Sequence, residues 1–312
     1  MKILISGATG FIGANLVTYL KDNLPDVEFS FLTRKKSGRP GEILWTELSQ
    51  KSLDGIDAVV HLAGLAHDTK NTLDESAYYQ VNFELTKLLY DYYQQSSAMK
   101  FIYISSVKAV ADKVEGILKE DVPPLPATAY GKSKLKAEVY ITQLSPGVAG
   151  KTYYILRPCM VHGPGNKGNL NLLYKFATKG LPYPLGAFDN SRSFLSIENF
   201  CFICKQLLTR DVQEGVYNLS DDEPLSTKEL FSIISDVAGT RARILDIPKS
   251  LVATLAKAGD FFKLPLNSER LQKLTENYVV SNAKVKSALG IGALPVTARQ
   301  GIARTISSFS QN

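Results

Sequence analysis

The chain has 312 residues, 45% of them hydrophobic and 21% charged, which suffices for one large domain or two modest ones with a self-supporting core. Its net charge of +6 points to an anionic partner: nucleic acid, a membrane surface or a small anion such as a nucleotide. Three cysteines cannot form a disulfide framework, and no apolar run reaches the roughly 18 residues of a membrane span.

The first half of the chain alternates short apolar runs with longer amphipathic stretches. Strands are predicted at 2–6, 27–32, 58–62, 100–105 and 152–156, and helices at 11–21, 73–95 and 129–142. Strands that alternate with helices of ten or more residues indicate βαβ units and a parallel sheet. The strands lack polar alternation, which indicates that helices cover both faces of that sheet.

The pattern changes near residue 163, where the loop 163–169 begins and later elements become less regular. Cys201 and Cys204 form a C-x-x-C pair in an apolar helical run, and this setting favours buried reduced thiols over a metal or redox site. The segment 247–266 carries four charges, which favours an amphipathic helix over a membrane anchor. The first residues lead straight into a strand and not a signal peptide, so a cytoplasmic location is expected.

A glycine-rich turn, Gly7-Ala-Thr-Gly10-Phe11-Ile12-Gly13, joins the first predicted strand to the first helix. Glycines allow a tight turn and a close approach of the backbone, and a helix N-terminus supplies N–H groups with partial positive charge. This context favours a dinucleotide pyrophosphate cradle over a merely structural turn. The predicted fold is therefore α/β, a doubly wound parallel sheet of the Rossmann type with a smaller C-terminal α/β lobe.

The G-x-x-G-x-x-G spacing resembles the extended branch of the short-chain dehydrogenase/reductase superfamily, which includes nucleotide-sugar epimerases, dehydratases and 4-ketoreductases. Further matches are His61-Leu-Ala-Gly64, Tyr79-Gln-Val-Asn82, Tyr130-Gly-Lys-Ser-Lys134, Leu156-Arg-Pro158, Gly163-Pro-Gly165 (with His162 in place of a Tyr) and Arg192-Ser-Phe-Leu-Ser-Ile-Glu198. The resemblance implies a cofactor-binding domain over 1–165, with returns from about 188–220, and a mainly substrate-binding lobe over 166–312.

Tyr130 and Lys134 are four residues apart and so share one helix face. A nearby ammonium and an oxidised nicotinamide both favour phenolate, so the pKa of Tyr130 is expected to fall from about 10 toward neutrality. Tyr130 then takes a proton from a sugar hydroxyl as hydride leaves the same carbon, or returns one to a ketone. The resemblance adds that Lys134 holds the nicotinamide ribose and that Ser106 hydrogen-bonds the reacting oxygen. The alternatives are a surface Tyr–Lys pair and a serine that only caps a strand end.

The residues after the strand at 100–105 bear on the type of reaction. In the 4,6-dehydratases this strand end carries Thr-Asp-Glu, the acid and base that expel water, whereas here it reads Ser106-Val107-Lys108. Dehydration is therefore not expected, and the string resembles a subgroup near the bacterial 4-ketoreductases. Lys108 is either a substrate contact or a solvated loop charge.

The second predicted strand is followed by Thr33, Arg34 and Lys35, with no carboxylate to accept from the adenosine ribose. Arg34 and Lys35 are suited to a 2′-phosphate, so NADP(H) is favoured over NAD(H), with a solvated basic turn as the alternative. By resemblance, the remaining cofactor contacts are Thr33, Glu47, Leu48, Leu62, Ala63, Gly64 and Asn82.

On the substrate side, the resemblance assigns Asn169 and Arg192 to the substrate diphosphate and Arg270 to a second phosphate contact, each with surface solvation as the alternative. It implies hydride transfer at C4 of a UDP- or dTDP-hexose by a 4-ketoreductase or 4-epimerase; the alternative is a catalytically silent cofactor-binding regulator. No metal site and no membrane span are expected. A nucleic-acid partner is not expected either, because no groove-reading motif is present. The family often pairs through its two long helices, which allows a homodimer through 73–95 and 129–142.

Overall fold

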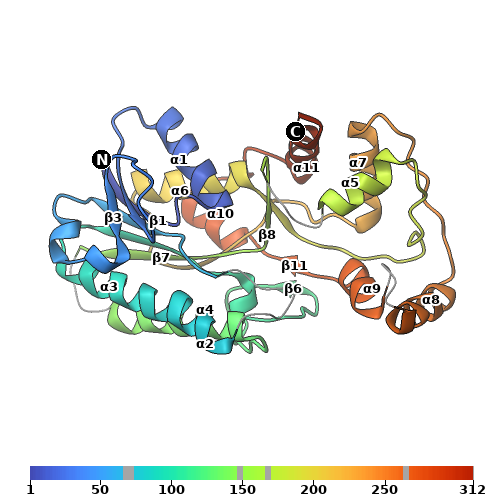
Figure 1. Ribbon diagram of the computed structural model, residues 1–312, viewed down its shortest axis with the longest axis horizontal. Helices are drawn as coiled ribbons and strands as arrows, with labels where there is room; N and C mark the ends of the chain where they lie inside the picture. The colour runs from blue at the N-terminus through green and yellow to red at the C-terminus, as the bar shows by residue number, and fades with distance from the viewer. Residues whose placement is uncertain (66–73, 146–149, 166–169, 263–266, 312) are drawn as a thin grey trace.

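The computed structural model describes residues 1–312 apart from 66–73, 146–149, 166–169, 263–266 and 312. A seven-stranded parallel sheet runs through the first part of the molecule in the order β10-β7-β5-β4-β1-β2-β3 (Figure 1). Its strands are β1 (Lys2–Ser6), β2 (Glu28–Thr33), β3 (Glu42–Leu44), β4 (Ala58–His61), β5 (Lys100–Ile104), β7 (Thr152–Pro158) and β10 (Gly215–Leu219). This order reverses direction between β1 and β4, so the doubly wound Rossmann sheet predicted from the sequence is confirmed.

Helices cover both faces of this sheet because its strands are apolar on both sides. One face packs against α1 (Phe11–Asn23), α6 (Ile197–Thr209) and α10 (Ala283–Leu289). The other face packs against α3 (Leu85–Gln95) and α4 (Ala129–Leu144). Neighbouring residues of β1 show the alternation, since Ile3 and Ile5 belong to the first layer and Leu4 to the second.

The helix predicted at 73–95 is not continuous. In the described part, α2 (Glu75–Tyr79) passes into a π-helical turn, η3 (Gln80–Glu84), before α3 begins. Apolar spacing alone does not distinguish a π-helical turn from an α-helix, so the sequence pattern could not locate the interruption. Such turns often occur at functional sites.

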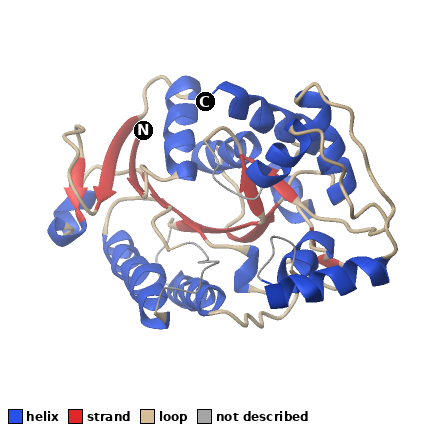
Figure 2. Ribbon diagram, turned by 45° about the vertical axis from the view of Figure 1, so that its right-hand side comes forward, coloured by secondary structure: helices blue, strands red, loops and turns tan. Residues whose placement is uncertain are grey.

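The C-terminal lobe contains α5 (Leu170–Thr178), α7 (Thr227–Val237), α8 (Lys249–Phe262), α9 (Ser268–Thr275) and α11 (Ala298–Ser307). Two small parallel sheets connect it to the Rossmann part: β8 (Met160–His162) with β9 (Phe194–Ser196), and β6 (Ile117–Leu118) with β11 (Val279–Val280). The lobe has its own apolar core between α5, α7, α8 and α11. The right-hand side of the molecule in Figure 2 is accordingly mostly helical. Short 3-10 turns occur at Trp45–Glu47 (η1), Gln50–Leu53 (η2), Val107–Ala109 (η4) and Ser308–Gln311 (η6).

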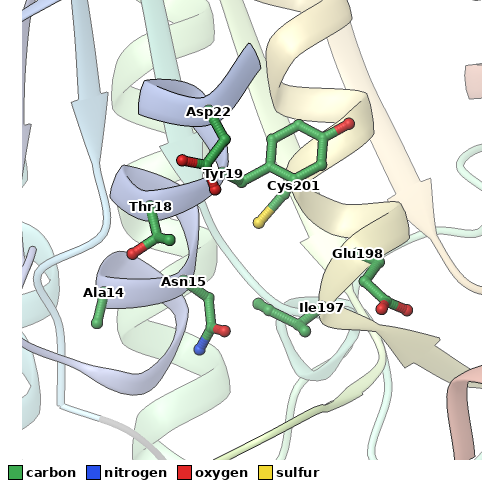
Figure 3. Close-up of a pocket in the computed structure, with 8 residues that line it drawn as sticks. All are labelled: Ala14, Asn15, Thr18, Tyr19, Asp22, Ile197, Glu198 and Cys201. Atoms are coloured by element: carbon green, nitrogen blue, oxygen red, sulfur yellow. The ribbon is translucent and has the colours of Figure 1, made fainter. Parts of the chain in front are cut away.

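Cys201 and Cys204 are buried where α6 meets the sheet, and burial raises the pKa of Cys201 to about 12. A shallow groove lies outside this point, between the solvent-facing sides of α1 and α6 (Figure 3). Asp22 and Glu198 contribute carboxylates to the groove, so its charge does not suit an anionic cofactor. No helix in the described ranges is long and apolar enough to cross a bilayer.

Candidate active site

The glycine-rich turn forms a cradle at the carboxyl end of β1. Gly7 has a left-handed φ of +75°, and a Cβ there would lie 2.7 Å from the backbone nitrogen of Ala63. A Cβ on Gly13 would lie 2.2 Å from the carbonyl oxygen of Gly7. Gly10 is the N-cap residue immediately before α1, and among the described residues no side chain caps that helix. Space for a close approach and an uncapped helix N-terminus suit a dinucleotide pyrophosphate, with Phe11 and Ile12 in the first turn.

The basic turn after β2 is only partly neutralised by nearby groups. Lys36 pairs with Glu47 at 2.9 Å, and the guanidinium of Arg39 stacks 3.6 Å from the centre of the Phe31 ring. Arg34 and Lys35 are exposed, and no carboxylate of the described chain lies within ion-pair distance of either. The turn therefore offers two cations to a ligand at the end of β2.

Three other residues of this region make contacts within the protein. The Thr33 hydroxyl closes the turn by bonding both the N–H and the carbonyl of Lys35. Glu47 also accepts from the backbone nitrogen of Leu44, and Leu48 is buried in the second core layer. Glu42 on β3 also belongs to this region, although no sequence motif indicates it, and its carboxylate accepts backbone N–H groups at 37–39. Glu42 is thus bonded to the loop backbone, not to the basic side chains.

A buried run of hydrogen bonds connects the ends of β1 and β4 to the π-helical turn. Burial, followed by the charge of Lys134, lowers the pKa of His61 to about 3, so its ring is neutral. The Thr86 hydroxyl donates to the carbonyl of Asn82, and so its oxygen accepts from His61 Nε2–H at 2.9 Å. Nδ1 then accepts from the Ser6 hydroxyl at 2.6 Å, and Ser6 Oγ accepts from the Ala63 amide at 3.1 Å. The His61 tautomer with its proton on Nε2 therefore satisfies every hydrogen bond in this run.

Asn82 joins the loop at Leu62–Leu65 to α4. Its side-chain oxygen accepts from the Leu65 amide at 2.8 Å, and its nitrogen donates to the Leu65 carbonyl and the Ser133 hydroxyl. Ser133 in turn donates to the carbonyl of Tyr130. The loop with Leu62, Ala63 and Gly64 is therefore held against the helix that carries the predicted catalytic pair.

Tyr130, Lys134 and Ser106 come together at the carboxyl ends of β4 and β5. A side-chain hydrogen bond with Ser106 lowers the pKa of Tyr130, but burial outweighs it, so the pKa is raised. The chain's own groups therefore do not lower the pKa of Tyr130; the expected fall also depended on an oxidised nicotinamide. Lys134 donates to the Ile104 carbonyl at 2.9 Å, and burial lowers its pKa to about 8. A Cβ on Gly64 would lie 3.0 Å from the Lys134 nitrogen.

A buried ion pair behind this site was missed by the sequence reading. Glu138 lies one turn beyond Lys134 on α4 and binds Arg157 of β7 through Nε and Nη2. Ser105, next to Ser106, donates to the same carboxylate. The sequence held one signal for this ion pair. Glu138 follows Lys134 by the same four residues that separate Lys134 from Tyr130, so an acidic side chain falls on the side of the helix that otherwise faces inward.

The predicted substrate contacts lie where the lobe meets the Rossmann part. The Lys108 ammonium contacts the Asp112 carbonyl at 2.8 Å and lies 4.6 Å from the centre of the Tyr278 ring. It is not a freely solvated charge, and burial lowers its pKa. Arg192 donates to the Lys273 carbonyl and lies 3.7 Å from Glu276.

Two further residues predicted to contact the substrate are Arg270 and Asn169. Arg270 is exposed in the first turn of α9, and its backbone N–H is capped by Asn267. Asn169 lies outside the described residues. Lys108 and Arg192 both adjoin Tyr278, since the Lys108 ammonium lies over its ring and the backbone of Arg192 forms a β-bridge with it.

Comparisons of sequence identify relatives along the whole chain. The NAD dependent epimerase/dehydratase family matches residues 3–220. A UDP-glucose 4-epimerase of Vibrio cholerae is 29% identical, with 99% of this chain and 96% of the relative aligned. An N-acetyl-alpha-D-glucosaminyl-diphospho-ditrans,octacis-undecaprenol 4-epimerase of Escherichia coli O157:H7 is 27% identical, with coverages of 98% and 94%.

Solved structures share the fold over the whole chain. UDP-N-acetylglucosamine 4-epimerase from Bacillus cereus superposes with a TM-score of 0.78 at 22% identity, covering 100% of both chains. RMD from Pseudomonas aeruginosa complexed with NADPH gives 0.71 at 23%, covering 100% of this chain and 99% of the other. Because the family match spans well over half its length, the chain belongs to the NAD dependent epimerase/dehydratase family, as an NAD(P)-dependent enzyme of the extended short-chain dehydrogenase/reductase type.

Proposed function

We propose that the chain epimerises C4 of a hexose carried by UDP or dTDP, with reduction of a C4 ketone as the alternative reaction. The observation that carries the proposal is the grouping of Tyr130, Ser106 and Lys134 beside the glycine cradle. Both curated relatives described above align over more than 90% of their own length and are named 4-epimerases, which supports epimerisation over reduction.

The proposed roles follow from the position and ionisation of each side chain. A bound nicotinamide supplies the hydride acceptor and donor for the sugar carbon. Tyr130, hydrogen-bonded to Ser106, exchanges the hydroxyl proton, because it is the titratable group at the reacting oxygen. Lys134, held by the Ile104 carbonyl one helical turn beyond Tyr130, carries a positive charge below about pH 8. Ser106 orients the oxygen with its hydroxyl.

The reaction is tested by incubating the protein with UDP-sugars and no added cofactor, then separating the products by HPLC. Interconversion of C4 epimers is expected, and Tyr130→Phe should lower the rate at least about 100-fold, the usual contribution of a positioned acid–base group. Turnover only of a 4-keto sugar with added NADPH would indicate the reductase. Cofactor binding without any turnover would indicate the silent regulator.

We also propose that the chain prefers NADP(H), because Arg34 and Lys35 are exposed after β2 without an acidic partner among the residues described. Arg34→Ser with Lys35→Ser should weaken NADP⁺ binding about 100-fold or more and leave NAD⁺ binding unchanged, since each lost charged hydrogen bond costs about 1.5–3 kcal/mol. Fluorescence titration of Trp45 measures both affinities.

Lys36→Ser is the matched control for this titration. Its ammonium is already bound by Glu47, so a much smaller effect on NADP⁺ binding is expected. Tighter binding of NAD⁺ than of NADP⁺ by the unsubstituted protein would contradict the preference.

One relative supports a second kind of group as the carrier of the sugar substrate. The Escherichia coli O157:H7 protein is named for a sugar joined through a diphosphate to undecaprenol, and it aligns with 98% of this chain. A polyprenyl diphosphate shares the diphosphate, but not the nucleoside, with a nucleotide sugar. Supplying both kinds of substrate in the HPLC assay compares the two carriers directly.

A further inference from the structure

A second tyrosine lies directly against the proposed catalytic phenol. The rings of Tyr78 and Tyr130 have their centres 6.2 Å apart and meet at 65°, the edge-on arrangement that aromatic pairs prefer. Tyr78 belongs to α2, and α2 packs against α4, which carries Tyr130 (Figure 1). Because Tyr78 is only 7% exposed, the phenol is covered on this side by a buried aromatic ring.

The burial of Tyr78 is not explained by the apolar cores. Across the residues that the structure describes, Tyr78 belongs to neither core layer of the sheet, nor to the lobe core, nor to the small apolar cluster around Val110 and Tyr278. Large buried side chains usually pack within such a core, as Phe83 of the same helical segment does in the second layer. A buried ring outside these cores, packed against the ring of Tyr130, points to a role at the site.

The helical segment that carries Tyr78 holds the start of α4 at two positions. The first is the ring contact at Tyr130, and the second is Asn82 in the π-helical turn η3, which donates to the Ser133 hydroxyl at 3.0 Å. Ser133 donates in turn to the Tyr130 carbonyl at 2.8 Å. The ring and the backbone of Tyr130 are thus held from the two sides of the point where α2 passes into η3. Turns of this type are frequent at functional sites.

The Tyr78 ring also belongs to the surroundings that set the ionisation of Tyr130. Burial, the largest influence, raises the pKa of Tyr130; a hydrogen bond with Ser106 lowers it, and the charge of an ionised Tyr78 raises it again. Tyr103 of β5 is also coupled to Tyr130 through charge, and Lys134 follows one turn later on α4. Replacing the Tyr78 ring by a smaller side chain should therefore admit water to the phenol, which favours phenolate.

We propose that Tyr78 is a positioning residue for the reaction: its ring fixes the phenol of Tyr130 against Ser106 and keeps water from that side of the site. The inference rests on the proposed function, in which Tyr130 is the acid–base group. A displacement of about 1 Å in a reacting group can cost about 100-fold in rate, so a correctly placed phenol requires a rigid neighbour. The motif that resembles the family begins at Tyr79, and sequence spacing therefore does not indicate Tyr78.

Steady-state turnover of a UDP-sugar tests the proposal with three variants. Tyr78→Leu keeps an apolar side chain but removes the ring, and it should lower kcat about tenfold or more with little change in KM, because the substrate contacts remain. Tyr78→Phe keeps the ring and should retain kcat within about twofold. Tyr79→Leu is the matched control, since that ring lies 5.6 Å from the exposed Lys136 ammonium, and its kcat should not change.

A readout that needs no turnover separates this inference from the assignment of the reaction. In protein labelled with ¹³C at the tyrosine Cζ and saturated with NAD⁺ or NADP⁺, the Tyr130 signal is identified by its absence from Tyr130→Phe. The pH midpoint of this signal should fall in Tyr78→Leu, because water then reaches the phenolate, and stay unchanged in Tyr79→Leu. A urea transition confirms that Tyr78→Leu is folded, and Tyr78→Met, with a longer apolar side chain, takes its place if it is not.

Three results would overturn the proposal: an unchanged kcat in Tyr78→Leu, an unchanged Tyr130 midpoint in that variant, or a loss of kcat in Tyr78→Phe as large as in Tyr78→Leu. The last result would assign the effect to the Tyr78 hydroxyl and not to its ring. An unsubstituted protein that binds cofactor but turns over no sugar would refute the proposed reaction. The Tyr130 midpoint would still test the ring contact in that case, so the two failures are distinguishable.

Discussion

Burial changes the ionisation of both members of the Tyr130–Lys134 pair, and each toward its neutral form. The pKa of Tyr130 is raised and that of Lys134 is lowered to about 8, because desolvation penalises phenolate and ammonium alike. Glu138 opposes the second shift by stabilising the ammonium. The phenol is thus protonated in the chain by itself, while the ammonium titrates close to physiological pH.

The lowered pKa of Lys134 predicts a pH-dependent stability difference. Between the folded value near 8 and the ordinary value of 10.5, the unfolded chain binds more protons than the folded one, so stability rises with pH. Relative to Lys134→Met, the unsubstituted protein should gain on the order of 3 kcal/mol between about pH 7.5 and about pH 11. Urea denaturation across this range measures the difference.

The exposed Lys132 on the same helix provides the control. Its ammonium remains in water in both states, so Lys132→Met should leave the pH profile of stability unchanged. A difference between the unsubstituted protein and Lys134→Met that stays constant over the range would contradict the burial argument, whatever its absolute size.

Among the elements, α4 places Tyr130, Lys134 and Glu138 along one side, four residues apart. The last of these binds Arg157 of β7 and accepts from Ser105 at the end of β5. Three elements therefore meet at one buried carboxylate, directly behind the proposed catalytic groups. We regard Glu138 and Arg157 as positioning residues that fix α4 relative to the strand ends.

Removing one partner of this ion pair should cost more than removing both. Arg157→Met leaves the Glu138 carboxylate buried and uncompensated, which costs about 3–5 kcal/mol of stability. The double variant Glu138→Leu, Arg157→Met should recover most of that loss, because no buried charge remains. Urea denaturation of the unsubstituted protein, Arg157→Met and the double variant measures it, and a double variant at least as unstable as Arg157→Met would contradict the account.

The same double variant distinguishes a positioning role of the Glu138–Arg157 pair from a purely stabilising role. If the pair fixes α4 against the end of β5, the folded double variant should turn over substrate at least about tenfold more slowly, with little change in KM. A double variant with the kcat of the unsubstituted protein would show that the pair contributes only to stability.

At the scale of the whole molecule, the chain passes repeatedly between its two parts. Helix α10 packs on the Rossmann sheet, β11 pairs with β6, and α11 packs against β8 and β9. His162 of β8 bonds Thr305 of α11 at 2.9 Å, in the interior. Because these contacts connect segments far apart in sequence, the unfolding of either part would remove packing contacts from the other.

This interleaving predicts a single cooperative unfolding transition. Trp45, the chain's one tryptophan, lies in the Rossmann part, whereas far-UV circular dichroism reports helices in both parts. The two signals should give the same urea midpoint, as two-state unfolding requires. Separate midpoints would show that the lobe unfolds as an independent domain.

The sequence predicted the features that depend on local pattern. Buried strands such as Lys2–Ser6 have continuous apolar runs, and the glycine turn has a definite spacing, so both were located correctly. The three-residue strand β3 was missed because it is too short to show periodicity. Glu138 was missed because its role depends on Arg157, 19 residues away on another element, and pairing of that kind cannot be read from spacing.

The hydrogen bonds from Ala63 to Asn82 all run from donor to acceptor in the same order along the chain of side chains. Each donor faces the same way, so the bond dipoles add, and each bond polarises the next. A substitution that removes the Ser6 hydroxyl would leave the Ala63 amide without its acceptor and His61 Nδ1 without its donor. The loop beside the dinucleotide cradle and the π-helical turn are thus connected through the two nitrogens of His61 and through the orientation of the protons along the run.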